Sequence, residues 1–234
     1  MALPRIDTPT YQTQLPSTGE TIQFRPFLVK EQKVIMMAEE SKDQNQMVTA
    51  MINLVGSCTF NKLDVAKLPT FDVEYLFLQI RGKSVGETID INVICPDDEV
   101  TSALVRVNID EIKIDKLEEH TNSLNITDTI KVYLRYPCMS DIDRFDNIET
   151  TEGMFKILYK CVNEIHYGDD VYHRIDISDK DIEDFVEQLT TEQFTKMTDF
   201  FQTMPKLSHT VEVTNPKTNV KSEVVLEGLQ SFLE

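Results

Sequence analysis

Four side chains that can bind a metal ion lie close together in the sequence: His166, Asp169, Asp170 and His173. Imidazole and carboxylate groups are ligands for zinc and iron, so this cluster would suit a metal-dependent enzyme. However, the spacing matches no established metal motif, and Gly168 places the cluster in a loop. The sequence therefore favours a solvated loop between helices, and we expect neither a metal nor a cofactor.

A second acidic segment contains part of a calcium-loop pattern. Loop positions one, three, seven, nine and twelve are Asp141, Asp143, Asn147, Glu149 and Glu152. Position five is Phe145, and position six, where a glycine makes the sharp turn, is Asp146. We therefore interpret this segment as the charged start of a helix.

Other patterns for catalysis do not occur. The chain has no nucleophile elbow, P-loop or dinucleotide-binding glycine pattern, and it contains only seven glycines for phosphate-binding loops. The four cysteines, Cys58, Cys95, Cys138 and Cys161, form no CxxC pair, so we expect buried free thiols instead of a zinc site or disulfides. These patterns predict a protein that is not an enzyme.

The composition narrows the classes of partner. The 234 residues carry a net charge of −17, which argues against binding to nucleic acid and suits a basic protein partner. No apolar run reaches the roughly 18 residues that a membrane-spanning helix needs. Met1–Gly19 contains no run resembling a signal peptide, so we expect synthesis in the cytoplasm.

The segment Leu68–Glu87 (LPTFDVEYLFLQIRGKSVGE) predicts the central element of the fold. Thr70 is a good N-cap, and Gly82 can take the left-handed conformation that ends a helix after Arg81. Helical spacing puts Phe71, Tyr75 and Leu78 on one face and Val73, Leu76, Phe77 and Ile80 on the opposite face. We therefore expect a helix that other elements cover on both sides.

The remaining periodicity predicts an α+β protein. Helical spacing or capping patterns occur at Leu28–Glu40, Asp43–Cys58, Asn147–His166, Ser178–Gln188 and Thr190–Pro205. Alternating patterns predict hairpins at Ile89–Ile109 and in His209–Leu233, where a short helix follows Gly228, and a strand at Thr129–Tyr136. Asp110–Asp128 is polar, and we expect it to be irregular.

These elements suggest three parts. Residues 1–20, which contain Pro4, Pro9, Pro16 and Gly19, form an extended arm; residues 21–137 form a mixed lobe; and residues 138–234 form a helical lobe ending in a hairpin and short helix. The two predicted hairpins share the order strand, x-Pro turn, strand and apolar turn. That order suggests related hairpins without establishing a duplication.

Four segments in order carry a resemblance to a known family. They are LPSTGETIQFRPFLVKEQKVIMMA (15–38), LPTFDVEYLFLQIRGKSVGE (68–87), LTTEQFTKMTDFFQTMPKLSH (189–209) and LEGLQSFL (226–233). The chain resembles the baseplate hub subunit family of T4-like contractile-tailed phages, with features of phages that infect cyanobacteria. The resemblance implies a virion tail protein without a catalytic motif, whose partners are other baseplate hub or wedge proteins.

The leading hypothesis is a structural baseplate subunit that acts by protein–protein interaction, with a homo-oligomer as a further option. Family members are described both as hub components and as assembly factors, so an assembly chaperone absent from the virion is the alternative, and a metal-dependent enzyme is a third.

The predicted contact surfaces are the arm (Leu3–Gly19) and the terminal hairpin with its helix (Thr210–Leu233). The predicted partner-binding residues are Leu3, Pro4, Ile6, Pro9, Tyr11, Leu15, Val211, Val213, Val224, Leu226, Leu229 and Phe232.

Overall fold

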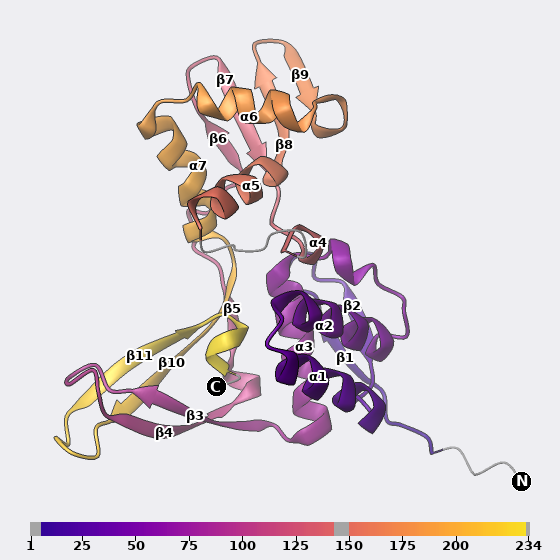
Figure 1. The fold of residues 1–234 in the computed structure, drawn as a ribbon, viewed down its shortest axis with the longest axis vertical. Coiled ribbons are helices and arrows are strands. Elements are labelled where there is room, and N and C mark those ends of the chain that lie inside the picture. Colours follow the sequence, from indigo (N-terminus) through magenta and orange to yellow (C-terminus); the bar gives the residue numbers. More distant parts are fainter. Residues whose placement is uncertain (1–5, 143–149, 233–234) are drawn as a thin grey trace, which may run out of the picture. The chain divides into compact units, whose positions relative to one another are not determined.

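The computed structural model describes residues 6–142 and 150–232, which fold as an α+β protein of two units (Figure 1). Unit 1 comprises Met1–Asp115 and Lys206–Glu234, and unit 2 comprises Lys116–Pro205. The structure therefore divides the chain differently from the predicted boundaries at residues 20 and 137. The C-terminal hairpin, which was predicted to be part of the second lobe, belongs to the same unit as the N-terminus, because β10 pairs with β5.

Unit 1 begins with a hairpin where the sequence predicted an extended arm. β1 (Tyr11–Gln14) pairs with β2 (Thr21–Phe24), so the arm prediction is wrong for residues 11–20. The four residues of β1 contain no proline, which leaves every N–H of the strand able to pair. In the turn of the hairpin, the N–H of Ser17 donates to Asp72 at 3.0 Å, and the Ser17 hydroxyl donates to the same carboxyl group.

Three helices and one short 3₁₀ turn follow the hairpin. They are α1 (Val29–Ser41), α2 (Gln44–Cys58), η1 (Val65–Lys67) and α3 (Thr70–Val85). The α1 and α2 predictions are confirmed, including the Asp43 cap of α2, whose side chain accepts from the N–H groups of Asn45 and Gln46. The two helices pack against each other as a helical hairpin.

Helix α3 is buried on two sides, as predicted. Its buried apolar residues are Phe71, Val73, Leu76, Phe77, Leu78 and Ile80, each at most 6% exposed. Two details of the prediction are wrong: the N-cap is Pro69, and Gly82 lies inside the helix, which ends at Val85 with Gly86 as its C-cap. A Cβ at Gly82 would lie 3.3 Å from Ile109 Cδ1, so the missing side chain allows η2 (Ile109–Glu111) to pack closely.

Both predicted hairpins are confirmed in unit 1. β3 (Thr88–Ile94) pairs with β4 (Ser102–Asn108), and β10 (Lys206–Thr214) pairs with β11 (Lys221–Glu227), followed by η4 (Leu229–Phe232). β10 also pairs with β5 (Lys113–Asp115), giving the order β11-β10-β5. The two hairpin turns are joined, because Asn215 Nδ2 and Thr218 Oγ1 donate to Asp97 at 2.9 and 2.5 Å.

Unit 2 is an antiparallel sheet with helices packed on it (Figure 1). The strand order is β6-β7-β8-β9, formed by Ser123–Asn125, Ile130–Leu134, Val162–Tyr167 and Asp170–His173. The helices are α4 (Met139–Ile142), α5 (Thr151–Cys161), α6 (Asp179–Glu187) and α7 (Thr191–Thr203), with η3 at Arg174–Asp176. Their core includes Val132, Leu158, Ile182, Met197 and Phe200.

The predictions in this part of the chain are partly right. The strand near Thr129–Tyr136 is confirmed as β7, and the capping boxes that begin α6 and α7 are present. The helix predicted at Asn147–His166 is wrong after Cys161, because Val162 and Ile165 pair with β7 as β8. Asp110–Asp128 is not wholly irregular, since it contains η2, β5 and β6. Most of the calcium-loop segment lies outside the described residues.

Within the described ranges, every helix is too short or too polar to cross a membrane.

Candidate functional site

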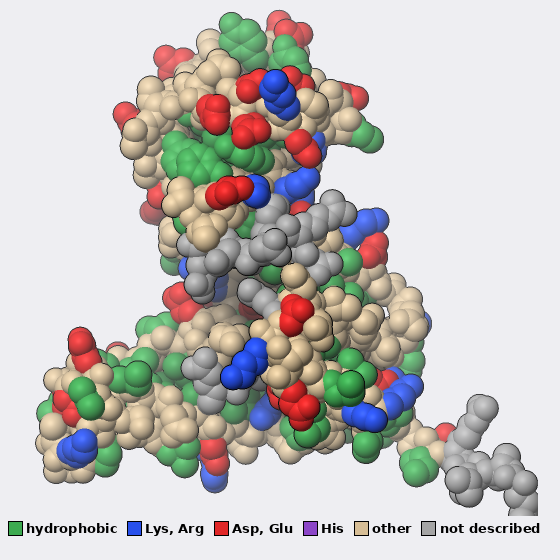
Figure 2. Space-filling model, in the orientation of Figure 1, with side chains coloured by type: hydrophobic (Ala, Val, Ile, Leu, Met, Phe, Trp, Pro, Cys, Tyr) green, Lys and Arg blue, Asp and Glu red, His purple; other side chains and the backbone are tan. Residues whose placement is uncertain are grey.

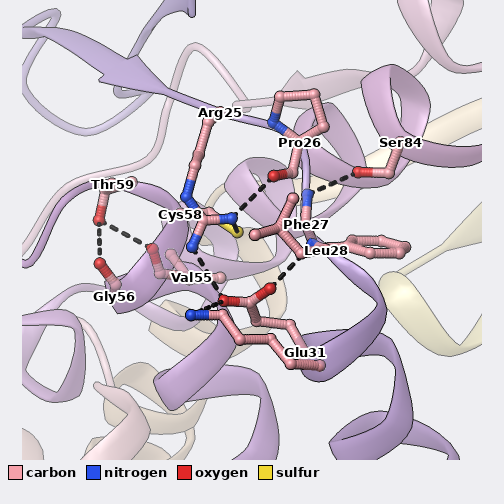
Figure 3. Close-up of polar contacts among 11 residues, drawn as sticks. Arg25, Pro26, Phe27, Leu28, Glu31, Val55, Gly56, Cys58, Thr59 and Ser84 are labelled. Carbon is pink, nitrogen blue, oxygen red and sulfur yellow. Dashed lines mark hydrogen bonds and ion pairs between the residues drawn. The ribbon is translucent and has the colours of Figure 1, made fainter. Parts of the chain in front are cut away.

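A polar cluster of unit 1 is centred on Arg25, immediately after β2 (Figure 3). Its guanidinium donates to the carbonyl of Pro26 at 2.9 Å and to Glu31 at 2.9 Å. Glu31 also accepts from the N–H of Leu28 at 2.8 Å, which caps α1. The Arg25 N–H donates to the carbonyl of Cys58, the last residue of α2, at 3.0 Å. We call Arg25, Glu31 and Cys58 the first arginine clasp.

Unit 2 contains the same arrangement immediately after β7. Arg135 donates to the carbonyl of Tyr136 at 3.1 Å and to the two carboxylate oxygens of Asp141 at 2.7 and 3.0 Å. Asp141 accepts from the N–H of Cys138 at 2.8 Å, and the Arg135 N–H donates to the carbonyl of Cys161 at 2.8 Å. Arg135, Asp141 and Cys161 form the second arginine clasp.

The two clasps share their spacing as well as their contacts. In each, the capped N–H comes three residues after the arginine and the acid comes six residues after it. Each clasp joins the end of a hairpin to the end of a helix, and each chain segment later continues through a helix, a hairpin and a 3₁₀ turn. The two segments therefore share one order of elements, although β8, β9, η3 and α6 occur only in the second and η1 only in the first. We call each segment, from its hairpin to its final 3₁₀ turn, a module.

Both clasps are ionic and satisfy their own polar groups. Burial, the largest single influence, raises the pKa of Glu31 and of Asp141. The hydrogen bonds from the arginines and from the capped N–H groups, together with the positive charge of the arginines, outweigh it and lower both pKa values. Burial raises the pKa of Cys58 to about 11 and of Cys161 to about 12. Both sulfurs are therefore thiols at neutral pH, whereas nucleophilic sulfur chemistry needs a thiolate. All four cysteines are buried and free, as predicted.

The four residues of the predicted histidine and aspartate cluster lie at different places along the hairpin β8–β9. His166 Nε2 lies 3.0 Å from Glu164, and His173 Nδ1 lies 3.4 Å from the same carboxylate. Asp169 lies in the turn, and Asp170 is the first residue of β9. In residues 6–142 and 150–232, no three His, Cys, Asp or Glu side chains are placed to hold a metal ion together.

The predicted partner-binding residues lie in different environments. Leu3 and Pro4 lie outside the described residues, Ile6 and Pro9 are exposed, and Tyr11 and Val224 are partly buried. The others, Leu15, Val211, Val213, Leu226, Leu229 and Phe232, are buried in the core of unit 1. Their role in binding stays a prediction, since in this structure these side chains stabilise unit 1 itself.

A groove in unit 2 was not predicted. Its lining residues, Ile130, Ile165, Tyr167, Tyr172, Ile177, Phe185 and Asp181, come from β7, β8, β9 and α6 and the segment before it. Tyr167 and Tyr172 are 55% and 48% exposed, so the groove presents two aromatic side chains to solvent. The groove was not predicted because residues 162–166 were assigned to a helix, whereas they form β8, the strand that places Tyr167 in the groove with Tyr172 of β9.

The comparison with protein families gives one match. A family model described as T4 bacteriophage base plate protein matches residues 8–234, nearly the whole chain. No curated protein and no solved structure matches the chain.

Proposed function

Because the chain belongs to the T4 bacteriophage base plate protein family, we propose that it is a structural subunit of the hub region of a phage tail baseplate. It acts by binding other baseplate proteins during assembly, without catalysis, and stays in the finished virion. The observation that carries this proposal is the family match over residues 8–234. The resemblance to hub subunits and to phages of cyanobacteria supports the finer assignment.

The groove of unit 2 supports a protein-binding role. Its walls are apolar and aromatic, as in the centres of protein interfaces, and β9 beside it is the edge strand of the sheet. Asp181 lies in the groove, and α6 also carries Glu183, Asp184 and Glu187. Acidic side chains are also frequent around apolar ones on the visible face of unit 2 in Figure 2. The partner that fits is a baseplate protein segment with an apolar anchor and flanking basic residues.

Substitution in the groove tests this role. Tyr172→Asp should reduce the incorporation of the subunit into baseplates at least about tenfold, because it puts a charge where the partner needs an apolar contact. Leu104→Asp is the matched control, since Leu104 is 66% exposed but lies on β4 of unit 1, outside the groove and outside both predicted contact surfaces. Equal assembly of the Tyr172 variant and wild type would contradict the groove as a contact surface.

Mass spectrometry of purified virions tests the structural role separately. Peptides of this chain at a stoichiometric level with known tail proteins are the expected result. Their absence, with normal assembly in infected cells, would instead support an assembly chaperone that leaves the particle. Deletion of residues 1–9 retains β1 and tests the first part of the predicted arm: unchanged particle yield would remove Leu3–Pro9 from the contact surfaces.

A further inference from the structure

The two modules differ at one edge of their hairpins. In unit 2, β8 pairs with the outer edge of β7, with Lys131 opposite His166 and Tyr133 opposite Glu164. Lys131 and Tyr133 lie four and two residues before Arg135, whose N–H donates to the carbonyl of Cys161. β8 starts at Val162, the residue after Cys161. The chain therefore runs from the clasp directly along the outer edge of β7.

In unit 1, the chain turns away at the same point. Cys58 also accepts from the arginine N–H, but Phe60 and Asn61 have positive φ values of 61° and 55°. The Asn61 N–H then donates back to the carbonyl of Gly56 at 2.8 Å. The only strand paired with β2 in the described part of the chain is therefore β1.

The free edge of β2 presents backbone hydrogen-bonding groups. The N–H of Leu15 donates to Glu20 at 2.9 Å, and bonded and non-bonded pairs alternate along an antiparallel ladder. This alternation directs the N–H and C=O of Thr21 and Gln23 away from β1, as Lys131 and Tyr133 are directed away from β6. Both residues are exposed, and no backbone hydrogen bond among the described residues uses these groups.

The edge also lacks the charges that keep strand edges apart. Neither β1 nor β2 contains a charged residue, although 27% of the chain is charged. The edge strands β5, β9 and β11 carry charged side chains, for example Lys113, Asp170 and Glu223, whereas the three-residue edge strand β6 (Ser123–Asn125) is uncharged like β2. Charged residues on edges oppose pairing between molecules, so β2 is an edge without that protection.

We propose that β2 pairs with β2 of a second copy of this chain about a twofold axis. Antiparallel pairing then puts Thr21 opposite Gln23 of the second copy, in both directions, and Ile22 opposite Ile22 on the buried face. This register is self-complementary, as an isologous interface requires, and it puts no like charges opposite each other. The product has the order β1-β2-β2-β1, in which one hairpin extends another as β8–β9 extends β6–β7 in unit 2.

Sedimentation velocity of the full chain between roughly 1 and 100 µM tests the pairing. Wild type should form a dimer, and Gln23→Pro should weaken it at least about tenfold, because the proline removes a bonding N–H from each copy. Gln12→Pro is the matched control: Gln12 faces Gln23 in the hairpin, and its N–H points to the other edge. A monomeric wild type, or equal weakening by both prolines, would overturn the proposal.

Paired charge variants keep the test valid if a proline disrupts folding. A chain with Thr21→Lys and Gln23→Lys should not dimerise, because each lysine faces a lysine of the second copy. A chain with Thr21→Glu and Gln23→Glu should also be monomeric. Mixing the two chains should restore a dimer, and failure to do so would contradict the register.

Discussion

The two arginine clasps have the same backbone contacts but different exposure. The Arg25 side chain is 12% exposed and that of Arg135 is 36% exposed, while both acids are 8% exposed. Glu31 reaches its arginine from the first turn of α1, whereas the shorter Asp141 does so from α4. Both units thus have an arginine directly after the second strand of a hairpin. The acidic residue differs, because it is a glutamate in the first clasp and an aspartate in the second. The comparison shows that the same hydrogen bonds can join a hairpin to a helix whether the arginine is nearly buried or partly exposed to water.

The largest expected effects come from the cores of the two units. Phe200→Ala should destabilise unit 2 by about 3–5 kcal/mol, because Phe200 is 1% exposed and packs against Tyr136 and His120. Leu78→Ala should destabilise unit 1 by about 2–5 kcal/mol. Calorimetry should then show a separate transition moving in each variant. Near-unchanged melting temperatures would contradict the core assignments.

The clasp substitutions test the comparison directly. Arg25→Met should destabilise unit 1 by about 3 kcal/mol, because it leaves the buried Glu31 carboxylate without its main partner. Arg135→Met should cost less, because water reaches the more exposed Arg135 site. Lys30→Met is the control, since Lys30 also lies near Glu31, at 3.4 Å, but is 72% exposed. Urea unfolding of the three variants should give this order, and equal losses for both arginine variants would remove the exposure argument.

The units should also differ in their response to pH. Burial raises the pKa of Glu74 on α3 to about 7 from 4.5, although the N–H of Leu229 donates to it. The folded state therefore binds more protons than the unfolded state between these values, and stability falls as pH rises through that window. Burial raises the pKa of Asp72 too, which acts in the same direction. The equivalent of Glu74 in α7, five residues after the N-cap, is Thr195.

Replacement of Glu74 by glutamine checks this difference. Glu74→Gln should reduce the loss of unit 1 stability between pH 5 and pH 7, measured by urea unfolding at each pH. The exposed Glu183 of unit 2 supplies the control variant Glu183→Gln, which should leave the pH profile as in wild type. An unaltered profile for the Glu74 variant would mean that its carboxyl group is not the source of the pH dependence.

The smallest effect is expected at the joined hairpin turns of unit 1. Hydrogen bonds from Thr218 and Asn215 lower the pKa of Asp97. This stabilisation is present above the ordinary pKa of 3.8 and is lost as pH falls through the folded value. Asp97→Ala should therefore lower the melting temperature slightly at pH 7 and have less effect in strong acid. A large loss at pH 7 would show that the turn contact holds more of unit 1 together than its exposure suggests.

Local patterns determined the elements that sequence analysis predicted correctly. The Asp43, Ser178 and Thr190 caps needed only hydrogen bonds within one helical turn, and the hairpin strands needed only alternation. The two apolar faces of α3 likewise follow from helical spacing. The α+β class could therefore be predicted, and the resemblance to T4-like baseplate proteins agrees with the family match.

Only the tertiary structure decided features that depend on distant partners. Val162 and Ile165 fit a helical face equally well, and pairing with β7 made them a strand. Gly82 stays helical because Ile109 packs on it, and Leu226 and Phe232 became core residues because the C-terminal hairpin joins the N-terminal unit. The arginine clasps were not predicted because their acids and neighbouring residues differ in sequence. Their shared geometry emerges only when a strand end and a helix end, far apart in the chain, meet through the backbone N–H of one arginine.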